Sequence, residues 1–203
     1  MKLVFLGPPA SGKGTQARQL ADERALPYLG TGALLRQAMR EDSPLGREAR
    51  VFLDRGQYLP DAVMIPLVLE WLDRQDGGWV LDGFPRSLAQ AEALEENFPG
   101  EVIPVVLEVP SEELELRVTG RRECPQCHWT AHRARVCNSC GGTMLAREDD
   151  SASKFRARLA AYRENVLPVV ARYQELGVAK VISGSGSPTE VANAVRAELV
   201  GVS

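Results

Sequence analysis

The stretch Gly7-Pro-Pro-Ala-Ser-Gly-Lys-Gly-Thr15 follows the apolar run 2–6 and precedes a segment, residues 16–23, with helical spacing. It matches the pattern G-x-x-x-x-G-K in the strand–loop–helix context that the pattern requires. Glycines let successive backbone N–H groups point at phosphate oxygens, the helix N-terminus adds a favourable dipole, and Lys13 carries a positive charge to the β and γ phosphates. A glycine-rich turn without a ligand is the alternative, and the agreement of loop and flanking segments disfavours it.

The hydroxyl residue of this loop stands one place later than usual. Gly14 follows Lys13 directly and Thr15 comes next, whereas the general pattern has Ser or Thr immediately after the lysine. The variant G-K-G-T narrows the class of nucleotide-binding protein.

Short apolar runs alternate along the chain with segments of helical spacing. The apolar runs cover residues 2–6, 79–81, 102–107 and 178–182, with 27–29 as a weaker candidate, and the helical segments cover 14–24, 31–41, 61–74, 87–97, 111–119, 154–175 and 188–200. Continuous apolar runs are typical of parallel strands covered on both faces. The order predicts an α/β fold, a five-stranded parallel sheet flanked by helices, with ligands beyond the carboxyl ends of its strands.

Composition and charge exclude several classes of partner. The chain has 203 residues and a net charge of −3, which disfavours binding to nucleic acid and leaves phosphate recognition to local arginine clusters. It has no run of the roughly 18 apolar residues that a membrane helix needs, so no membrane association is expected. Because no export signal is visible at the N-terminus, we expect a cytoplasmic protein, and nothing in the sequence suggests that it is other than a monomer.

All four cysteines lie in two Cys-x-x-Cys pairs, Cys124-Pro-Gln-Cys127 and Cys137-Asn-Ser-Cys140. Four thiolates at this spacing suit a tetrahedral Zn²⁺, and because sulfur fills all four positions the ion would be structural. Two disulfides are the alternative, disfavoured in a reducing compartment. His128 and His132 could replace a cysteine, but the cysteines complete the set and we expect both histidines at the surface. Residues 120–150 therefore read as an insertion with its own small fold.

With the loop variant in hand, five further segments resemble those of the adenylate kinase family, in the family's order and over nearly the full chain. Two segments in the N-terminal half resemble family motifs: T-G-D-M-L-R is matched by Thr31-Gly-Ala-Leu-Leu-Arg36, and G-x-x-[VL]-[PST]-D by Gly56-Gln-Tyr-Leu-Pro-Asp61. The motif D-G-F-P-R-x-x-x-Q is matched by Asp82-Gly-Phe-Pro-Arg86 with Gln90. Further on, R-x-x-G-R-R resembles Arg117-Val-Thr-Gly-Arg121-Arg122, and R-x-D-D with a downstream arginine resembles Arg147-Glu-Asp149-Asp150 with Arg158. Some members also carry a four-cysteine zinc site in a lid over ATP, usually with a longer spacer.

The resemblance implies two nucleotide sites. AMP would be held by Thr31, Arg36, Gln57, Tyr58, Leu59, Gly83, Phe84, Pro85, Arg86, Gln90, Arg147 and Arg158, and ATP by Ala10, Ser11, Gly12, Lys13, Gly14, Thr15, Arg117, Arg121 and Gly186. The residue types agree with these roles, because an arginine offers a planar fork of donors to phosphate oxygens and a glutamine offers both a donor and an acceptor to adenine.

The implied reaction is the reversible conversion of ATP and AMP to two ADP, with Mg²⁺ on the donor phosphates. Phosphoryl transfer of this kind rests on alignment and charge stabilisation and needs no general base. The catalytic residues would be Lys13, Arg86, Arg121, Arg147 and Arg158, and Asp82 would hold Mg²⁺ through water. Ala33 replaces the family's aspartate, which removes one carboxylate near the transfer site.

The resemblance also divides the chain. Residues 1–29, 60–119 and 151–203 would form the core, residues 30–59 a helical AMP-binding insertion, and residues 120–150 a zinc-bearing lid, both of which close over the substrates. Two other functions remain open: a kinase for CMP, UMP or another monophosphate, and a zinc-ribbon P-loop protein that binds nucleic acid or acts as a regulatory NTPase.

Overall fold

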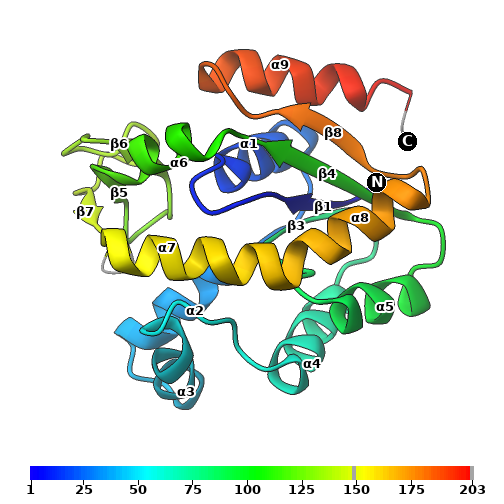
Figure 1. Cartoon of the computed structure of the whole chain (residues 1–203), viewed down its shortest axis with the longest axis horizontal. Helices are drawn as coiled ribbons and strands as arrows, with labels where there is room; N and C mark the ends of the chain where they lie inside the picture. The colour runs from blue at the N-terminus through cyan, green and yellow to red at the C-terminus, as the bar shows by residue number, and fades with distance from the viewer. Residues whose placement is uncertain (148–149, 202–203) are drawn as a thin grey trace.

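A five-stranded parallel sheet lies at the centre of the computed structural model, which describes residues 1–147 and 150–201 (Figure 1). Its strands run in the order β2-β3-β1-β4-β8. They are β1 (Lys2–Leu6), β2 (Tyr28–Gly30), β3 (Trp79–Asp82), β4 (Val102–Glu108) and β8 (Lys180–Ser183). The predicted fold class is confirmed, and β8 differs from its expected range by beginning at Lys180.

Helices connect these strands and cover the sheet. They are α1 (Lys13–Arg24), α2 (Thr31–Arg40), α3 (Pro44–Leu53), α4 (Asp61–Leu72), α5 (Leu88–Asn97), α6 (Ser111–Val118), α7 (Ala152–Ala161), α8 (Leu167–Glu175) and α9 (Pro188–Glu198), with a π-helical turn, η1 (Tyr162–Val166), between α7 and α8. The helical segment expected over 154–175 is found as α7, η1 and α8, which follow one another without a break. Pro168 has no N–H to donate to the preceding turn, and a proline inside a helix displaces the regular bonding pattern.

Helix α3 was not expected from the sequence. The Ser43 side chain caps it by accepting a hydrogen bond from the Gly46 N–H at 3.1 Å, and Pro44 occupies its first turn. Both are standard signals for the start of a helix. Together α2 and α3 make the segment 30–59 a helical insertion that projects below the sheet in Figure 1.

The two faces of the sheet carry different cores. Leu3 and Phe5 of β1 pack with α1 and α9, whereas Val4 and Leu6 pack with α4, α5 and α8 (Figure 1). Successive strand residues point to opposite faces, so both sets become buried, as the continuous apolar run required. This burial fixes the carboxyl end of β1, from which the glycine-rich loop leaves.

The segment 120–150, here called the lid, forms a separate small antiparallel sheet in the order β6-β5-β7. Its strands are β5 (Arg121–Glu123), β6 (Thr130–His132) and β7 (Leu145–Ala146). Among the lid residues that the structure describes, the buried ones are the small apolar cluster of Cys124, Cys137 and Met144, together with Glu123. Among the described residues, no helix is both long and apolar enough to cross a membrane.

Candidate active site and metal centre

The glycine-rich loop leaves the central strand and wraps round the start of α1. Ala10 and Gly12 adopt positive φ angles of 67° and 91°, which turn the chain so that Lys13 begins the helix. The Lys13 Nζ atom donates to the Pro8 carbonyl oxygen at 3.1 Å, across the hollow of the loop. This is the cradle of backbone donors and one lysine that the sequence predicted.

The unusual Gly14 has a steric reason. A β-carbon at this position would lie 2.7 Å from the Oδ2 atom of Asp82, at the end of β3. That same Oδ2 accepts a hydrogen bond from the Tyr28 hydroxyl at 3.3 Å, and Asp82 Oδ1 is buried with no hydrogen-bond partner among the described residues. The glycine that follows Lys13 in this variant loop thus makes room for the Asp82 carboxylate. Because one oxygen of that carboxylate has no hydrogen-bond partner in the part of the chain that the structure describes, the site fits an Mg²⁺-bound water.

Electrostatics at this point reflect crowding of positive charge. Burial lowers the pKa of Lys13 to about 7; Asp82 opposes the shift, and the nearby Arg86, Arg158 and Arg121 add to it. Burial and Asp82 together hold the pKa of Tyr28 far above its ordinary value, so its hydroxyl remains a donor. A site with this excess of positive charge is prepared for an anion of several charges.

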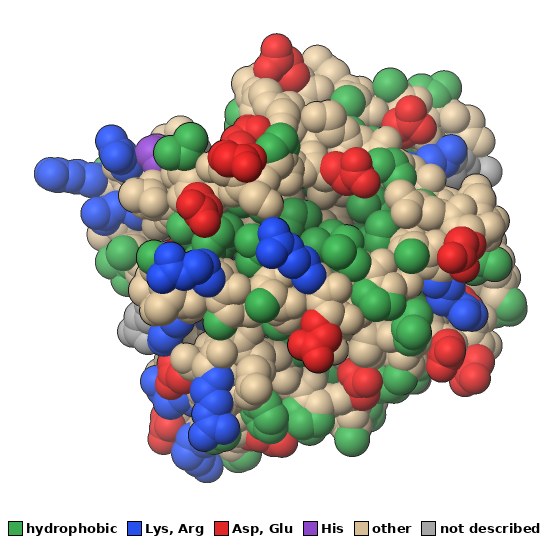
Figure 2. Space-filling model, viewed as in Figure 1, with side chains coloured by type: hydrophobic (Ala, Val, Ile, Leu, Met, Phe, Trp, Pro, Cys, Tyr) green, Lys and Arg blue, Asp and Glu red, His purple; other side chains and the backbone are tan. Residues whose placement is uncertain are grey.

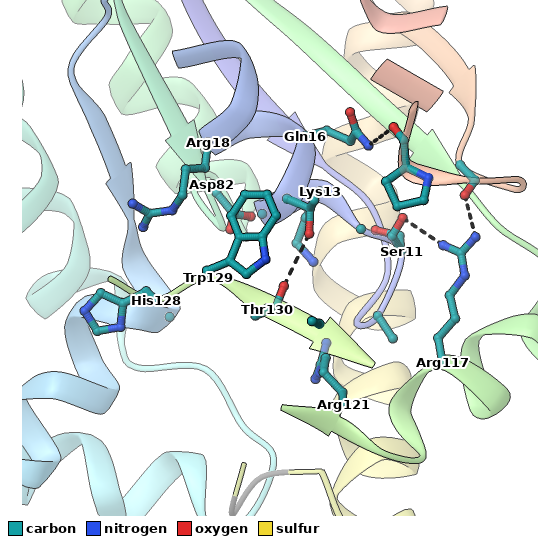
Figure 3. A pocket seen from close by; sticks show the side chains of 18 of the residues that line it. Ser11, Lys13, Gln16, Arg18, Asp82, Arg117, Arg121, His128, Trp129 and Thr130 are labelled. Atoms are coloured by element: carbon teal, nitrogen blue, oxygen red, sulfur yellow. Dashed lines mark hydrogen bonds between the residues drawn. The ribbon is translucent and has the colours of Figure 1, made fainter. Parts of the chain in front are cut away.

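A cavity of about 720 Å³ opens between the loop, the lid and α2 (Figure 3). It gathers many of the predicted site residues from distant parts of the chain: Ala10, Ser11, Gly12, Lys13, Gly14, Thr15, Arg36, Asp82, Arg86, Arg117, Arg121, Arg147, Arg158 and Gly186. Ala33, where the family carries aspartate, also lines it. The volume suits ligands well above the size of a single phosphate.

Arg117 connects the two loops at one end of the cavity. Its guanidinium donates to the Ser11 carbonyl oxygen at 3.2 Å and to the Gly184 carbonyl oxygen at 2.7 Å, and it pairs with Glu113 (Figure 3). The glycine-rich loop and the 183–188 loop that contains Gly186 are therefore held side by side, which leaves a planar guanidinium face at the cavity wall.

Asp150 draws three arginines together at the other side. Arg121 donates from Nε to Asp150 Oδ2 at 2.7 Å, Arg158 Nη1 lies 3.4 Å from Oδ1, and Arg147 Nε lies 4.0 Å from Oδ2. These arginines come from β5, α7 and the end of the lid, and each was predicted. Asp149, the neighbouring residue in the family pattern, lies outside the described residues.

The remaining residues predicted for AMP gather around Arg86, which itself lines the cavity. The Thr31 hydroxyl donates to the Gly83 carbonyl oxygen at 2.9 Å, Arg86 Nε donates to the same oxygen at 2.7 Å, and the Arg86 guanidinium lies 4.5 Å from the centre of the Tyr58 ring. The Phe84–Pro85 peptide bond is cis. Leu59, Phe84 and Pro85 are buried, whereas Gln57 is exposed.

Gln90 has polar partners that the sequence did not reveal. Its Nε2 donates to Asp61 Oδ1 at 2.7 Å, and its Oε1 accepts from the Arg86 backbone N–H at 2.7 Å. The carboxamide therefore ties the 83–86 turn to the start of α4. Its further donor and acceptor capacity is what could serve a base.

Sequence reasoning missed a set of lid residues that face the cavity. His128, Trp129 and Thr130 line it, and the hydroxyls of Thr130 and Thr15 lie 3.3 Å apart (Figure 3). His132 is exposed as expected, but the His128 side chain is only 18% exposed. These residues reach the loop through the folded lid, in which β6 pairs with β5, and that pairing joins segments that no local motif connects.

Glu123 of β5 was also missed. It is buried, and although burial raises its pKa, the hydrogen bond with His128 and the charges of Arg36 and Arg147 lower that pKa to about 2. Arg36 Nη2 lies 2.8 Å from Glu123 Oε2. A buried, ionised carboxylate thus lies among residues predicted to bind phosphate.

The four cysteines converge at the far side of the lid. Their Sγ atoms all lie within 4.8 Å of one another, with 3.5 Å between Cys124 and Cys140 and 3.5 Å between Cys127 and Cys137. Four sulfurs at about 2.3 Å from a tetrahedral ion would lie about 3.8 Å apart, so the arrangement fits Zn²⁺. All four cysteines are free thiols in the structure, which disfavours the disulfide alternative.

The thiols perturb one another's ionisation. Backbone N–H groups, that of Cys127 foremost, lower the pKa of Cys124 to about 7. For Cys140 the Gly142 N–H lowers the pKa, but the thiols of Cys127 and Cys124 outweigh it and raise the pKa to about 12. Mutual repulsion of thiolates is what a divalent ion relieves. The donor set therefore fits a metal, with no fifth position for chemistry.

Comparison with known proteins gives one consistent family. The family model described as "Adenylate kinase" matches residues 5–178. A curated protein named adenylate kinase from Thermodesulfovibrio yellowstonii is 40% identical over 98% of this chain and 99% of its own length. Those of Moorella thermoacetica and Archaeoglobus fulgidus are 42% and 38% identical, each over 91% of both chains.

Proposed function

This chain belongs to the adenylate kinase family and is an ATP:AMP phosphotransferase, and we propose that the 720 Å³ cavity is where its two nucleotides meet. The observation that supports this is the convergence on one cavity of a phosphate loop and five arginines from separate segments: Arg36, Arg86, Arg121, Arg147 and Arg158. One lysine and one loop suffice for a triphosphate, so a further cluster of arginines indicates a second phosphorylated substrate.

ATP occupies the loop side of the cavity in this proposal. The backbone of residues 10–15 and the Lys13 ammonium bind the phosphates, while Arg121 approaches from the lid. Arg117 and the Gly186 loop flank the base, because Arg117 already joins those two loops through carbonyl oxygens. Asp82, with one unsatisfied oxygen, would hold Mg²⁺ through water, and that ion would neutralise donor phosphate charge.

AMP occupies the side formed by the helical insertion. Arg36 and Arg86 bind its phosphate, and the turn 83–86 with Gln90 and residues 57–59 holds the adenosine. Thr31 and Gln90 have intramolecular partners, so they act as much by fixing the turn as by contacting the base. Arg147 and Arg158 stand between the two halves and span both nucleotides.

Transfer follows from alignment rather than from proton chemistry. The AMP phosphate oxygen attacks the γ-phosphorus, the bond from that phosphorus to the bridging β–γ oxygen breaks, and negative charge spreads over the equatorial oxygens. Lys13, Arg86, Arg121, Arg147 and Arg158 stabilise that charge. The lid covers the cavity through Trp129 and Thr130, which excludes water as a competing acceptor.

Zinc completes the lid in this proposal. A segment of roughly this size cannot bury a core sufficient for its own folding, and four thiolates around Zn²⁺ supply the missing free energy. The ion keeps the lid rigid while it moves, and it takes no part in the reaction. We further propose that the protein is a cytoplasmic monomer. Its core would comprise residues 1–29, 60–119 and 151–203, its AMP-binding insertion residues 30–59, and its lid residues 120–150.

The acceptor is tested by coupled turnover of MgATP with AMP, CMP, UMP and GMP in turn, together with metal analysis of the same sample. We expect a clear preference for AMP and one zinc per chain. Preference for CMP or UMP would assign another monophosphate kinase. Salt-dependent RNA or DNA binding without turnover of any monophosphate would favour the nucleic-acid-binding alternative.

A further inference from the structure

Glu123 joins the two parts of the protein that must separate for substrates to enter. It lies on β5 of the lid, and Arg36 lies on α2 of the helical insertion. Arg36 Nη2 lies 2.8 Å from Glu123 Oε2, and Arg36 Nε donates to Oε1 at 3.4 Å. Arg147 Nε lies 3.5 Å from Oε2. The three side chains are 22%, 6% and 9% exposed for Arg36, Glu123 and Arg147 respectively, so the group is largely shielded from water.

The arginine partners of Glu123 are Arg36, which the proposed function assigns to the AMP phosphate, and Arg147, which it places across both nucleotides. A carboxylate and a phosphate present similar pairs of oxygens to the guanidinium fork, so they compete for the same donors. Their negative charges also repel one another in a site of low dielectric constant. A bound AMP phosphate and an ionised Glu123 carboxylate are therefore in conflict at Arg36 and Arg147.

The carboxylate is held by charge but incompletely bonded. Glu123 Oε2 is buried, and none of the described residues gives it a well-aligned hydrogen bond despite the two arginines nearby. A buried ion group with an unsatisfied oxygen is less stable than one with full hydrogen bonding. Such a contact is strong enough to form and weak enough for a dianion to displace.

His128 adds a second contact at a cost in backbone strain. Its Nδ1 lies 3.2 Å from Glu123 Oε1, and its φ is 59°, a left-handed conformation that non-glycine residues rarely adopt. In the second cysteine knuckle the corresponding turn position is Gly141, with φ 75°. Strain of this kind persists where the surrounding structure uses the side chain, and here the side chain orients Glu123.

We propose that Glu123 is a latch: with no nucleotide bound, its carboxylate takes the place of the AMP phosphate at Arg36 and Arg147 and holds the lid against the helical insertion. AMP binds by displacing it. The apparent affinity for AMP is then lower than the intrinsic affinity by the fraction of unlatched protein, and ATP, which shares Arg147 but not Arg36, is affected less. This inference rests on the proposed assignment of Arg36 and Arg147 to AMP.

The substitution Glu123→Gln tests the latch, because it keeps the shape and removes the charge. We expect AMP alone to bind roughly tenfold more tightly by calorimetry, with a smaller change in the Kd for MgATP. The nucleotide-free variant should also have a larger radius of gyration by X-ray scattering. Glu123→Asp keeps the charge on a shorter side chain, and its AMP affinity should lie between the two.

Asp54→Asn is the matched control. It removes the 3.0 Å ion pair between Asp54 of the helical insertion and Lys154 of α7, which is exposed and touches none of the phosphate arginines. Its AMP affinity and radius of gyration should equal those of the wild type. Melting temperature and zinc content are measured for every variant, and if Glu123→Gln loses zinc, Glu123→Asp decides the outcome.

Two results overturn the latch. Weaker AMP binding in Glu123→Gln would mean that the carboxylate positions the arginines for AMP, and unchanged binding would mean that the ion group is only structural. Failure of the proposed function looks different, because the wild-type protein itself would then fail to consume AMP.

Discussion

The central sheet and the lid sheet are both made of short strands, but different forces hold them together. Leu3, Phe5, Val80 and Leu107 of the central sheet are fully buried between two helical layers. The lid buries little apolar surface beyond Cys124, Cys137 and Met144, and its buried residues include the charged Glu123. The core is stable through apolar burial, whereas the lid, in the function proposed above, depends on a metal and on ion pairs. A part of the second kind can move without disturbing the first.

The difference also appears on the surface. Figure 2 shows Lys and Arg side chains gathered at the lid end and at the helical insertion, while the face over α8 and β8 is mixed. Positive charge thus gathers on the two segments that we propose to move, while the core supplies the phosphate loop.

The largest effect is expected from removing a lid charge. Arg121→Ala should lower kcat/KM for AMP and MgATP on the order of a thousandfold, because Arg121 stabilises charge on the transferred group. The melting temperature should fall only modestly, since Arg147 and Arg158 still pair with the buried Asp150 when Arg121 is removed. Steady-state kinetics and thermal unfolding check both statements, and near-normal activity would contradict the assignment.

Arg122→Ala is the control for this prediction. Arg122 is adjacent on β5 but does not line the cavity, and its Nη1 donates to the Met144 carbonyl oxygen at 3.2 Å. Its activity should stay close to that of the wild type.

The second largest effect is expected from removing the metal, which should destabilise the lid more than the core. Cys127→Ser leaves three thiols, chelation leaves all four thiols without the ion, and either change removes the crosslink of the two knuckles. A loss of about 2 kcal/mol would lower the melting temperature by about 4–8 °C for a chain of this size. Activity at low temperature should fall less than stability does. Ser139→Ala in the second knuckle, which removes no ligand, is the control, and an unchanged melting temperature in Cys127→Ser would count against a structural metal.

The pKa of Lys13, in the core, depends in part on the charge of Arg121, in the lid. Its pKa is lowered to about 7 by burial and by arginines that include Arg121, so at pH 8 it is mostly neutral without nucleotide. The triphosphate favours the charged form, which raises this pKa and takes up a proton. ATP affinity should therefore fall by up to about tenfold per pH unit above pH 7.

Calorimetry in buffers of different ionisation enthalpy measures the uptake directly. We expect more proton uptake at pH 8 than at pH 6, where Lys13 is already charged. Lys13→Arg removes the contribution of the side chain, because arginine stays protonated, and so corrects for titration of ATP itself. Equal uptake by the two proteins at pH 8 would contradict the lowered pKa.

The smallest predicted effect compares matched glycines in the two regions. Gly141 of the lid and Gly177 after α8 have φ values of 75° and 68°, and a β-carbon on either would meet no atom within 4 Å. An alanine therefore costs about 1 kcal/mol from backbone conformation alone. Gly177→Ala should lower the free energy of global unfolding, whereas Gly141→Ala should lower zinc affinity and amide protection in the lid. The same response from both would mean that lid and core unfold as one unit.

Much of the fold could be predicted because its signals are local. The five apolar runs, the glycine-rich loop and the paired cysteines each lie within a few residues, and the structure confirms the sheet and the convergence of the thiols. Helix α3 was missed although Ser43 and Pro44 mark its start and its sequence is amphipathic at helical spacing.

The unpredicted features depend on contacts between distant residues. The close approach of Gly14 to Asp82 and the ion pair of Arg36 with Glu123 join positions far apart in the sequence. The bonds of Gln90 with Asp61 are of the same kind. A motif identifies residue types suited to a role, but which of their donors and acceptors the protein itself occupies follows only from the folded chain.

The most direct test of the two-nucleotide site follows the phosphorus atoms. Phosphorus NMR of purified protein with MgATP and AMP should show two ADP formed for each ATP consumed, with no inorganic phosphate, and the reverse reaction from ADP alone. Release of inorganic phosphate with AMP unchanged would contradict the account, because it would show a phosphate loop that passes its phosphoryl group to water and a cavity with no acceptor nucleotide.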